Sequence, residues 1–262
     1  MITAGIDIGA KFVKVVVMKD GKLAAKAMTM GGFDQKASSE ETFRKALEEA
    51  GATESDVKMV IATGAGKDEF RLKSEKVTEV TADARGASIV LPSARTIISV
   101  GAEEGRAIRM DAQGKVVDFA INEKCAAGAG AFTEAMARAL EVKVEDLGRL
   151  SLQSTNAVPM NAQCAVFAES EVVSLVAAGT SKPDIARAIH DAIASRISSM
   201  ARRISVENDV LLIGGVAKNK GFAESLRRDL QMNVVVPEDP DFISALGAAY
   251  VAYERASGKG GA

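Results

Sequence analysis

The sequence predicts an α/β protein built from two copies of one small domain, and two observations support this prediction. The first is a pattern of strand, glycine turn, strand, polar hairpin and strand that begins at the N-terminus and occurs again near residue 96. The second is its nearly constant spacing, because Gly101 follows Gly9 by 92 positions and Gly114 follows Gly21 by 93. A pattern repeated at a fixed offset is typical of a duplicated domain, and we expect a cleft between the copies. The alternative is that two unrelated hairpin meanders look alike.

Turn and cap signals mark the elements of the first copy. Gly9 and the pair Asp20-Gly21 predict two tight connections between antiparallel strands. Ser39 provides a helix N-cap and Gly51 a helix end. The predicted elements are three strands between residues 2 and 30, a helix over 39–50, a strand over 57–62 and a mixed segment to about 88.

The second copy is longer and contains most of the predicted helices. Pro183 is placed to open one of them, since proline is accepted in the first helical turn. After its hairpin strands we expect a helix following Cys125, a turn at 144–146, a loop over 151–162, helices over 165–178 and 182–203, a strand over 210–213, a helix over 221–230, a strand over 233–236 and a helix over 243–253. The predicted domains are residues 1–92 and 93–262, with the last helix a candidate to pack back on the first domain.

The composition excludes several classes of protein. With 262 residues and 47% hydrophobic content, the chain is long enough for a substantial core. A net charge of −2 with both signs interspersed, and no tryptophan, argue against a nucleic-acid partner. No apolar run of 18 residues occurs and no signal-like segment opens the chain, so we expect a cytoplasmic protein without a membrane span.

The only two cysteines, Cys125 and Cys164, each stand where a polar loop ends and a helix is predicted to begin. Phe132, Met136 and Leu140 share a face of the first helix, and Phe167, Val172 and Val176 are expected near one face of the second. Unpaired N–H groups at a helix start favour a thiolate or an anionic cluster. Tetrahedral zinc and iron–sulfur clusters take four ligands, so a dimer could complete an all-cysteine site. The alternative is two buried cysteines acting as small apolar residues; a disulfide is less expected.

Three glycine-rich turns are candidates for phosphate binding, because backbone N–H groups there approach oxygens without a Cβ clash. These turns contain Gly9, Gly101 and the pair Gly214-Gly215, and neither a P-loop nor a G-x-G-x-x-G motif follows the first strand. Asp7 is the candidate for holding hydrated Mg²⁺, and Lys14 for approaching a phosphate. An ordinary turn aspartate and a solvated lysine are the alternatives.

The single histidine, His190, lies within a predicted helix and is expected to be structural.

With these motifs placed, the chain resembles the family of 2-hydroxyacyl-CoA dehydratase activators and the ATPase subunits of ATP-dependent benzoyl-CoA reductase. This family belongs to the superfamily of acetate and sugar kinases, heat-shock chaperones and actin. The resemblance covers essentially the whole chain and is carried by the segments 122–130, 164–171 and 214–219. It implies duplicated actin-like ATPase domains with a nucleotide cleft between them.

The resemblance also implies cofactors and partners. A dimer is expected to hold one [4Fe–4S] cluster between subunits through Cys125, Cys164 and their two counterparts. The other half of the dimer is a second copy or a homologous ATPase subunit. ATP or ADP with Mg²⁺ is expected in the cleft. The implied contacts are Asp7, Gly9, Ala10 and Lys11 near the phosphates, Gly101 and Ala102 opposite them, and Gly214, Gly215 and Asn219 near the adenosine.

The activity implied by the resemblance is ATP hydrolysis that drives a low-potential electron from ferredoxin or flavodoxin into a reductase or dehydratase component. One departure bears on the subfamily. Activators carry Asp-Ile-Gly-Gly-Gln-Asp at the second turn, whereas this chain has Ser99 in place of the first carboxylate, and Glu103 or Glu104 is the candidate to compensate. We assign Glu104 as catalytic together with Asp7. The continuation from Gly105 to Arg109 looks more like the small benzoyl-CoA reductase ATPase subunit, which we therefore predict ahead of a dehydratase activator.

Two other classes stay open at this point. A small-molecule kinase of the same superfamily would need no metal cluster, and a nucleotide sensor or assembly factor would bind ATP with negligible hydrolysis. Neither explains two cysteines at helix starts.

Overall fold

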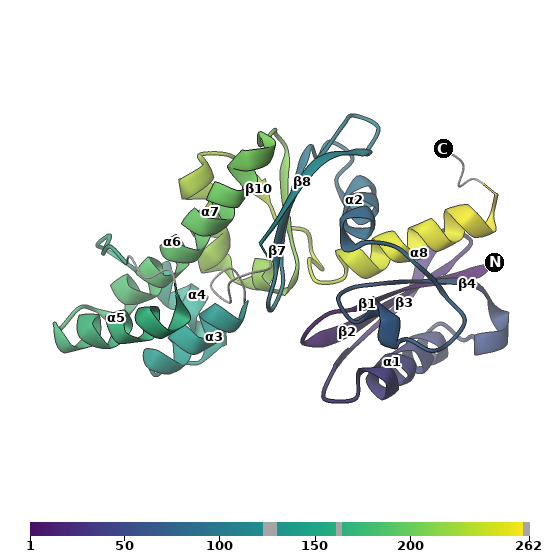
Figure 1. The fold of residues 1–262 in the computed structure, drawn as a ribbon, viewed down its shortest axis with the longest axis horizontal. Coiled ribbons are helices and arrows are strands. Elements are labelled where there is room, and N and C mark those ends of the chain that lie inside the picture. Colours follow the sequence, from purple (N-terminus) through teal and green to yellow (C-terminus); the bar gives the residue numbers. More distant parts are fainter. Residues whose placement is uncertain (123–129, 161–163, 259–262) are drawn as a thin grey trace. The chain divides into compact units, whose positions relative to one another are not determined.

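The computed structural model describes residues 1–122, 130–160 and 164–258, which form two compact units (Figure 1). The first unit comprises residues 1–93, 111–116 and 241–262, and the second comprises 94–110 and 117–240. Each unit is built around a five-stranded sheet of its own.

The first unit contains the N-terminal hairpins and the C-terminal helix of the chain. Its elements are β1 (Ile2–Ile8), β2 (Phe12–Lys19), β3 (Lys22–Met30), α1 (Gln35–Glu49), η1 (Glu54–Asp56), β4 (Val57–Thr63), η2 (Lys67–Glu69), β5 (Glu75–Lys76), α2 (Glu79–Val90) and α8 (Ile243–Ala256).

The second unit contains the remaining strands and most of the helices. Its elements are β6 (Thr96–Val100), β7 (Gly105–Met110), β8 (Val116–Asn122), α3 (Gly130–Ala139), α4 (Val144–Ser151), α5 (Ala165–Ala177), α6 (Lys182–Ala201), η4 (Arg202–Ile204), β9 (Val210–Ile213), η5 (Gly215–Lys218), α7 (Lys220–Leu230) and β10 (Val234–Val235).

The two sheets have the same topology, which confirms the predicted duplication. The strand order is β3-β2-β1-β4-β5 in the first unit and β8-β7-β6-β9-β10 in the second. In both, the first strand pairs antiparallel with the second and parallel with the fourth, and the fifth pairs parallel with the fourth. The predicted α/β class is therefore correct, with one mixed sheet in each unit.

The first sheet is covered on both faces, as Figure 1 shows for α1 and α8. Side chains alternate along a strand, so Val13 and Val15 of β2 pack in a cluster with Phe43 of α1. Val16 points to the opposite face and packs with Ala245 of α8.

Helix α8 lies close to its neighbours because small residues line the contact. A Cβ atom at Gly5 of β1 would overlap the backbone of Ala245 and Ala249. A Cβ atom at Gly247 would overlap the carbonyl oxygen of Ala82 in α2. The absent side chains allow the backbones of strand and helix to approach each other directly.

The core of the second unit joins the sheet to α3, α5, α6 and α7. Ile98 of β6, Phe132 and Met136 of α3, Ile189 of α6 and Phe222 of α7 are all fully buried in one cluster. The prediction that Phe132, Met136 and Leu140 share a buried face is confirmed, since their side chains are at most 1% exposed.

Three local predictions were wrong. Helix α1 begins at Gln35 and is capped by Asp34, so Ser39 lies inside the helix and does not cap it. The predicted turn at residues 144–146 is the first turn of α4, where Glu145 and Asp146 stand at the positive end of the helix. Phe167 and Val172 do not share a face, because Phe167 is 71% exposed whereas Val172 is completely buried. Helix α5 is apolar on both sides, so its apolar spacing does not identify the buried side.

Among the residues that the structure describes, no helix combines the length and apolar character needed to cross a membrane.

Candidate functional site

The first glycine turn places a carboxylate and a cation together at the end of β1. The Gly9 N–H donates to the Phe12 carbonyl at 3.0 Å, which closes a tight connection to β2. Because β1 and β2 are antiparallel, Asp7 lies opposite Lys14, and their side chains form an ion pair of 3.1 Å. Both predicted residues are therefore together, and the Asp7 residue is only 7% exposed. Lys14 is an ion-pair partner rather than a solvated lysine.

The turn is supported by the segment that follows β4. Gly64 has φ of +92°, and a Cβ atom there would overlap the Ile8 carbonyl and lie 2.6 Å from Asp7 Oδ1. The Gly66 N–H donates to the Ile8 carbonyl at 2.8 Å. Gly64 thus permits this segment to lie close to the Asp7 carboxylate. The predicted strand over 57–62 ends just before these glycines, and the sequence pattern does not indicate their approach to Asp7.

Ala10 and Lys11 form the tip of the same turn. Ala10 is exposed, and the Lys11 carbonyl accepts a hydrogen bond from the Gly31 N–H at 2.9 Å. The Lys11 ammonium lies 5.8 Å from the centre of the Phe12 ring. These two residues are accessible to a ligand at the turn.

The second glycine turn repeats this backbone geometry in the second unit. The Gly101 N–H donates to the Glu104 carbonyl at 2.9 Å, which matches the bond from Gly9 to Phe12. The Glu104 carboxylate forms an ion pair of 2.5 Å with Arg106. Arg106 also donates to the Ser99 hydroxyl at 3.4 Å. Glu104 therefore supplies a carboxylate beside Ser99, and no sequence pattern identified Arg106 as its partner.

The Gly214-Gly215 bend follows β9 as Gly64 follows β4. Gly214 has φ of +89°, and a Cβ atom there would overlap the Val100 carbonyl at the end of β6. Its N–H donates to the Pro240 carbonyl at 2.7 Å. A Cβ atom at Gly215 would meet nothing within 4 Å. Gly214 is therefore a packing glycine, whereas Gly215 leaves open space for a ligand.

Asn219 is engaged inside the second unit. Its side-chain oxygen caps α7 by accepting the Phe222 N–H at 3.1 Å, and its amide nitrogen lies 2.9 Å from His190 Nε2. His190 is completely buried, and burial lowers its pKa to about 4. This agrees with the expected structural role of His190. A contact of Asn219 with adenosine stays a prediction.

The second glycine turn is joined to α3 by backbone hydrogen bonds. The N–H groups of Gly130 and Ala131, at the start of α3, donate to the carbonyls of Gly101 and Ala102 at 2.8 and 2.9 Å. A Cβ atom at Gly130 would lie 3.3 Å from Val216 of η5 and 3.4 Å from the Gly101 carbonyl. We call these residues the Gly130 junction: Gly101, Ala102, Gly130, Ala131 and Val216. Its members are far apart in sequence, and no local pattern identifies them together.

Cys164 occupies the N-cap position of α5 and its thiol is exposed, so the predicted placement at a helix start is confirmed for this cysteine. Cys125 lies outside the described residues. Within 1–122, 130–160 and 164–258, no group of three or more histidine, cysteine, aspartate or glutamate side chains could hold a metal ion.

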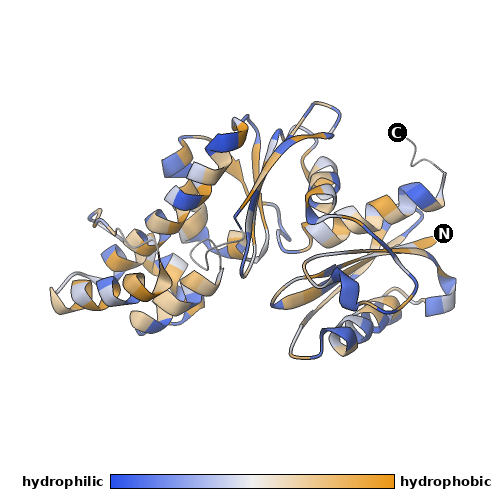
Figure 2. Cartoon of the chain, viewed as in Figure 1, coloured by the Kyte–Doolittle hydropathy of each residue, from blue (hydrophilic) through white to orange (hydrophobic). Residues whose placement is uncertain are grey.

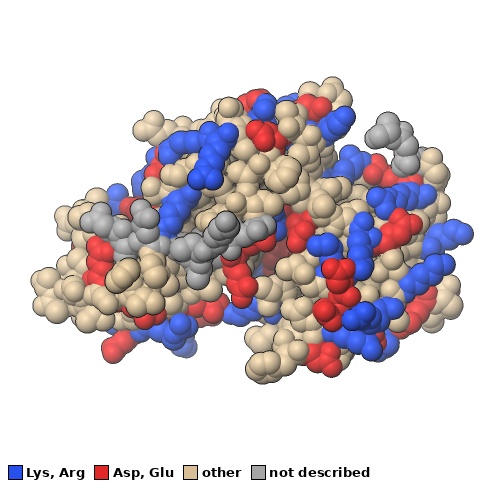
Figure 3. All heavy atoms as spheres, viewed as in Figure 1, with Lys and Arg blue, Asp and Glu red and all other residues tan. Residues whose placement is uncertain are grey.

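Helix α5 presents an uncharged face to solvent beside Cys164. Figure 2 shows this helix in hydrophobic colours over much of its length, and Figure 3 shows few charged atoms at that end of the second unit. Val166, Phe167 and Val173 are 68%, 71% and 58% exposed. With helical spacing, these residues share one side of the helix, which we call the α5 face: Val166, Phe167, Ser170, Val173, Ser174 and Ala177.

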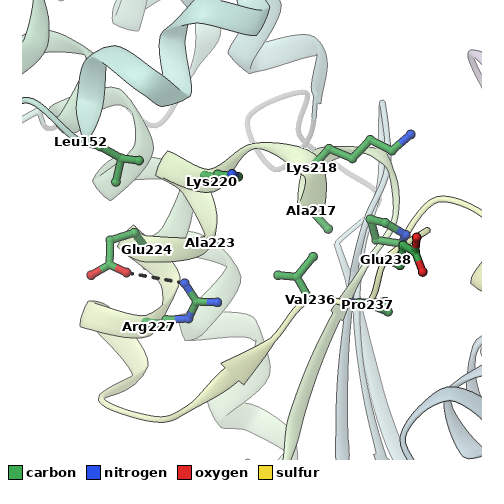
Figure 4. Close-up of a pocket in the computed structure, with 11 residues that line it drawn as sticks. Leu152, Ala217, Lys218, Lys220, Ala223, Glu224, Arg227, Val236, Pro237 and Glu238 are labelled. Atoms are coloured by element: carbon green, nitrogen blue, oxygen red, sulfur yellow. Dashed lines mark ion pairs between the residues drawn. The ribbon is translucent and has the colours of Figure 1, made fainter.

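A pocket of about 580 Å³ lies beside α7 (Figure 4). Glu224 and Arg227 on its wall form an ion pair of 3.5 Å. Of the predicted nucleotide-binding residues none lines this pocket, although Ala217 and Lys218 follow the Gly214-Gly215 bend directly. The lining residues are Leu152, Ala217, Lys218, Lys220, Ala223, Glu224, Arg227, Val236, Pro237, Glu238 and Pro240.

Comparisons with known proteins agree on one family. Residues 4–252 match the BadF/BadG/BcrA/BcrD ATPase family. The activator of lactoyl-CoA dehydratase from Anaerotignum propionicum is 39% identical, over 99% of this chain and 100% of that protein. A subunit of benzoyl-CoA reductase from Thauera aromatica is 36% identical, over 95% of this chain and 92% of that protein.

A solved structure gives the same result. The (R)-2-hydroxyglutaryl-CoA dehydratase component A of Acidaminococcus fermentans superposes with a TM-score of 0.94 at 36% identity, covering 98% of this chain and 99% of that one. This match confirms the predicted fold class. Together with the two glycine turns and the exposed cysteine at a helix start, these similarities show that the chain belongs to the BadF/BadG/BcrA/BcrD ATPase family.

Proposed function

We propose that this protein is an ATP-hydrolysing activator that passes low-potential electrons from ferredoxin or flavodoxin to a 2-hydroxyacyl-CoA dehydratase. The full-length similarity to the lactoyl-CoA dehydratase activator supports this assignment, as does the superposition on component A. The comparisons favour it over the small benzoyl-CoA reductase subunit, which the sequence pattern after Gly105 favoured. The reductase role is kept as a second candidate because the Thauera aromatica reductase protein is 36% identical.

In this proposal, the glycine turns of both units contribute to binding ATP. Gly9, Ala10 and Lys11 contact the phosphates, and the Asp7 carboxylate holds hydrated Mg²⁺ with Lys14 beside it at 3.1 Å. Gly101 and Ala102 also contact the phosphates. Gly215, which has open space where a side chain would project, lies near the adenosine together with Gly214 and Asn219.

The Gly130 junction is the observation that carries the proposed coupling. A ligand that displaces the carbonyls of Gly101 and Ala102 displaces the first residues of α3, because two backbone hydrogen bonds join them. Helix α3 packs against α5 through a shared core that includes Phe132 and Val172. Since α5 begins after Cys164, a change at the nucleotide turn has a continuous packed route to this cysteine.

The exposed Cys164 thiol fits a ligand to an anionic cluster, because the free N–H groups of a helix start favour negative charge. Cys164 and Cys125 would hold a [4Fe–4S] cluster together with the same two residues of a second subunit, and the cluster would supply a one-electron carrier of low potential. The α5 face next to Cys164 would be covered in such a dimer.

The first experiment measures iron and acid-labile sulfide per dimer, with an EPR spectrum of the reduced protein, after purification without oxygen. About four irons per dimer are expected. Replacement of Cys164 by serine is expected to lose the cluster while ATP binding is retained. Iron-free wild-type protein under strict anoxia, or full iron content in Cys164→Ser, would contradict the assignment.

A second experiment tests the coupling. Gly130→Ala adds a methyl group 3.3 Å from the Val216 side chain, which must give way by a few tenths of an ångström, and 3.4 to 3.5 Å from the backbone of Gly101 and Ala102. ATP-dependent electron delivery to a dehydratase is expected to fall about tenfold while iron content is unchanged. Ala131→Gly keeps both backbone hydrogen bonds and serves as the control. Equal electron delivery by Gly130→Ala and wild type would exclude the junction as the route.

A third experiment tests the dimer. Val173→Glu places a charge on the α5 face, where it would be buried against a partner. Light scattering after size exclusion is expected to show a monomer, and iron content should fall with it. Glu169→Gln, at the exposed edge of the same face, should leave the dimer intact. A dimeric Val173→Glu protein would show that another surface joins the subunits.

A further inference from the structure

The two glycine turns share one backbone geometry but arrange their charges differently. Asp7 and Ser99 each stand two positions before the turn glycine, and each lies opposite a cationic residue on the next strand, Lys14 and Arg106. In the first turn, the strand residue supplies the carboxylate. In the second, Ser99 is 3% exposed and its hydroxyl can carry no charge at neutral pH.

In the second turn, the carboxylate that pairs with the cation comes from within the turn. The Glu104 side chain reaches back to Arg106, which lies opposite Ser99 and donates to both residues. A guanidinium can do this because its donors form a planar fork, whereas a lysine ammonium presents one point charge. The side chains of Arg106 and Glu104 are 14% and 29% exposed, so the pair is held in place yet still accessible from solvent.

We propose that Arg106 is a positioning residue that holds the Glu104 carboxylate beside Ser99, where Glu104 orients the water that attacks ATP. This inference rests on the proposed function. The water oxygen forms a bond to the γ-phosphorus while the bond from that phosphorus to the bridging oxygen breaks, and ADP leaves. The proton of the water passes to Glu104 and then to solvent, so that ADP and inorganic phosphate are the products.

This geometry explains how Glu104 can act in hydrolysis in a chain that has Ser99 in place of an aspartate. The side chain of glutamate is long enough to return from the turn to the strand end, and Arg106 fixes the direction in which it points. Without Arg106, the Glu104 side chain would be free to turn into solvent, and the attacking water would lose its orientation.

Steady-state ATP hydrolysis by the full-length dimer tests the inference. Glu104→Gln is expected to lower kcat at least about 100-fold, and Arg106→Gln about tenfold or more, with KM for ATP within about threefold of wild type. Arg106→Lys should fall between Arg106→Gln and wild type. Arg109→Gln is the matched control, because Arg109 lies on the same strand and pairs with Glu207 at 3.2 Å, away from the turn.

Moving the carboxylate from position 104 to position 99 by substitution provides the decisive comparison. Ser99→Asp combined with Glu104→Gln restores the arrangement of the first turn, a carboxylate on the strand opposite a cation. This double variant should hydrolyse ATP about tenfold faster than Glu104→Gln alone. Because Asp at position 99 would also give Arg106 a new ion-pair partner, urea unfolding of the single and double variants is measured in parallel, and a rescue counts only where their stabilities agree.

The outcomes separate this inference from the proposed function. If wild-type protein hydrolyses no ATP with its iron content complete, the proposed function fails. If wild type hydrolyses ATP and Arg106→Gln hydrolyses it equally fast, only the roles of Arg106 and Glu104 are overturned. The same holds if Ser99→Asp does not raise the hydrolysis rate of Glu104→Gln.

Discussion

His190 is completely buried and its ring meets the neutral side chain of Asn219, which has a consequence for stability. Burial lowers its pKa to about 4 in the folded protein, against an unfolded value of about 6.5. Below pH 6.5, His190 is protonated in the unfolded chain but stays neutral in the folded protein. Stability is therefore complete above pH 6.5 and declines as the pH falls toward 4, by a total on the order of 3 kcal/mol.

Urea unfolding between pH 7.5 and 5 measures this effect. His190→Gln should show a smaller decrease in the free energy of unfolding over this range than wild type, although it is less stable at pH 7.5 because the packing around Asn219 changes. Equal slopes for the two proteins would mean that folding does not lower the pKa of His190.

Asp184 is the anchor of the segment that follows α4. Its carboxylate accepts the backbone N–H groups of Asn156 and Thr155 and the hydroxyls of Ser181 and Ser154, at 2.7 to 3.0 Å. These hydrogen bonds, that of the Asn156 N–H foremost, hold the pKa of Asp184 well below its usual range. In Asp184→Ala, we expect faster hydrogen exchange of the amides at 155 and 156. Unchanged exchange there would show that other contacts hold the segment.

At the scale of elements, the packing of helix α8 against β1 depends on the absence of a side chain at Gly5. The chain places α8 so near β1 that any Cβ atom at this position meets backbone, which no rotamer change can relieve. Gly5→Ala should lower the free energy of unfolding by about 3 kcal/mol or more, or prevent folding. Urea denaturation measures the difference.

Gly31→Ala is the control for this prediction. A Cβ atom at Gly31 would lie 3.6 Å from its nearest neighbour, the Lys11 carbonyl, which is an ordinary contact. The free energy of unfolding of Gly31→Ala should stay within about 0.5 kcal/mol of wild type. Similar losses in the two variants would contradict the close approach of α8 to β1.

Helix α5 shows the limit of sequence periodicity at this scale. Its buried side carries Ala168 and Val172, but the opposite side carries Val166, Phe167 and Val173. An apolar surface exposed in this way is typical of a contact with another protein. The failed prediction that Phe167 and Val172 share a face therefore points to this exposed apolar side of α5.

At the scale of the whole molecule, the duplication extends to matching glycines. Gly64 and Gly214 have φ of +92° and +89°, and each would place a Cβ atom against a carbonyl at the end of the first strand of its own sheet. Alanine at either position should therefore destabilise its own unit by about 2 kcal/mol or more.

Hydrogen exchange measured separately for each unit tests this equivalence, because a two-unit protein need not unfold in one step. Gly64→Ala should accelerate exchange in β1 and β4, and Gly214→Ala in β6 and β9. If only one variant accelerates exchange in its unit, alanine at Gly64 and alanine at Gly214 differ in their cost to stability although the two backbones match.

The sequence alone determined the duplicated α/β fold, the positions of the glycine turns and the helix that begins after Cys164. These features are encoded in contiguous residues, since turn chemistry and helix capping act over a few positions. Asp7 and Lys14 were each expected to bind a ligand, and the pairing of β1 with β2 shows that their side chains meet.

Only the tertiary structure decided the remaining features. The Gly130 junction joins residues from separate segments of the chain, and Asn219 meets His190 across two helices. The exposed side of α5 also depends on which neighbours cover it. Such contacts arise from packing between elements, and the sequence of each element is compatible with more than one neighbour. The route from a nucleotide turn to a cysteine helix is therefore a property of the folded chain.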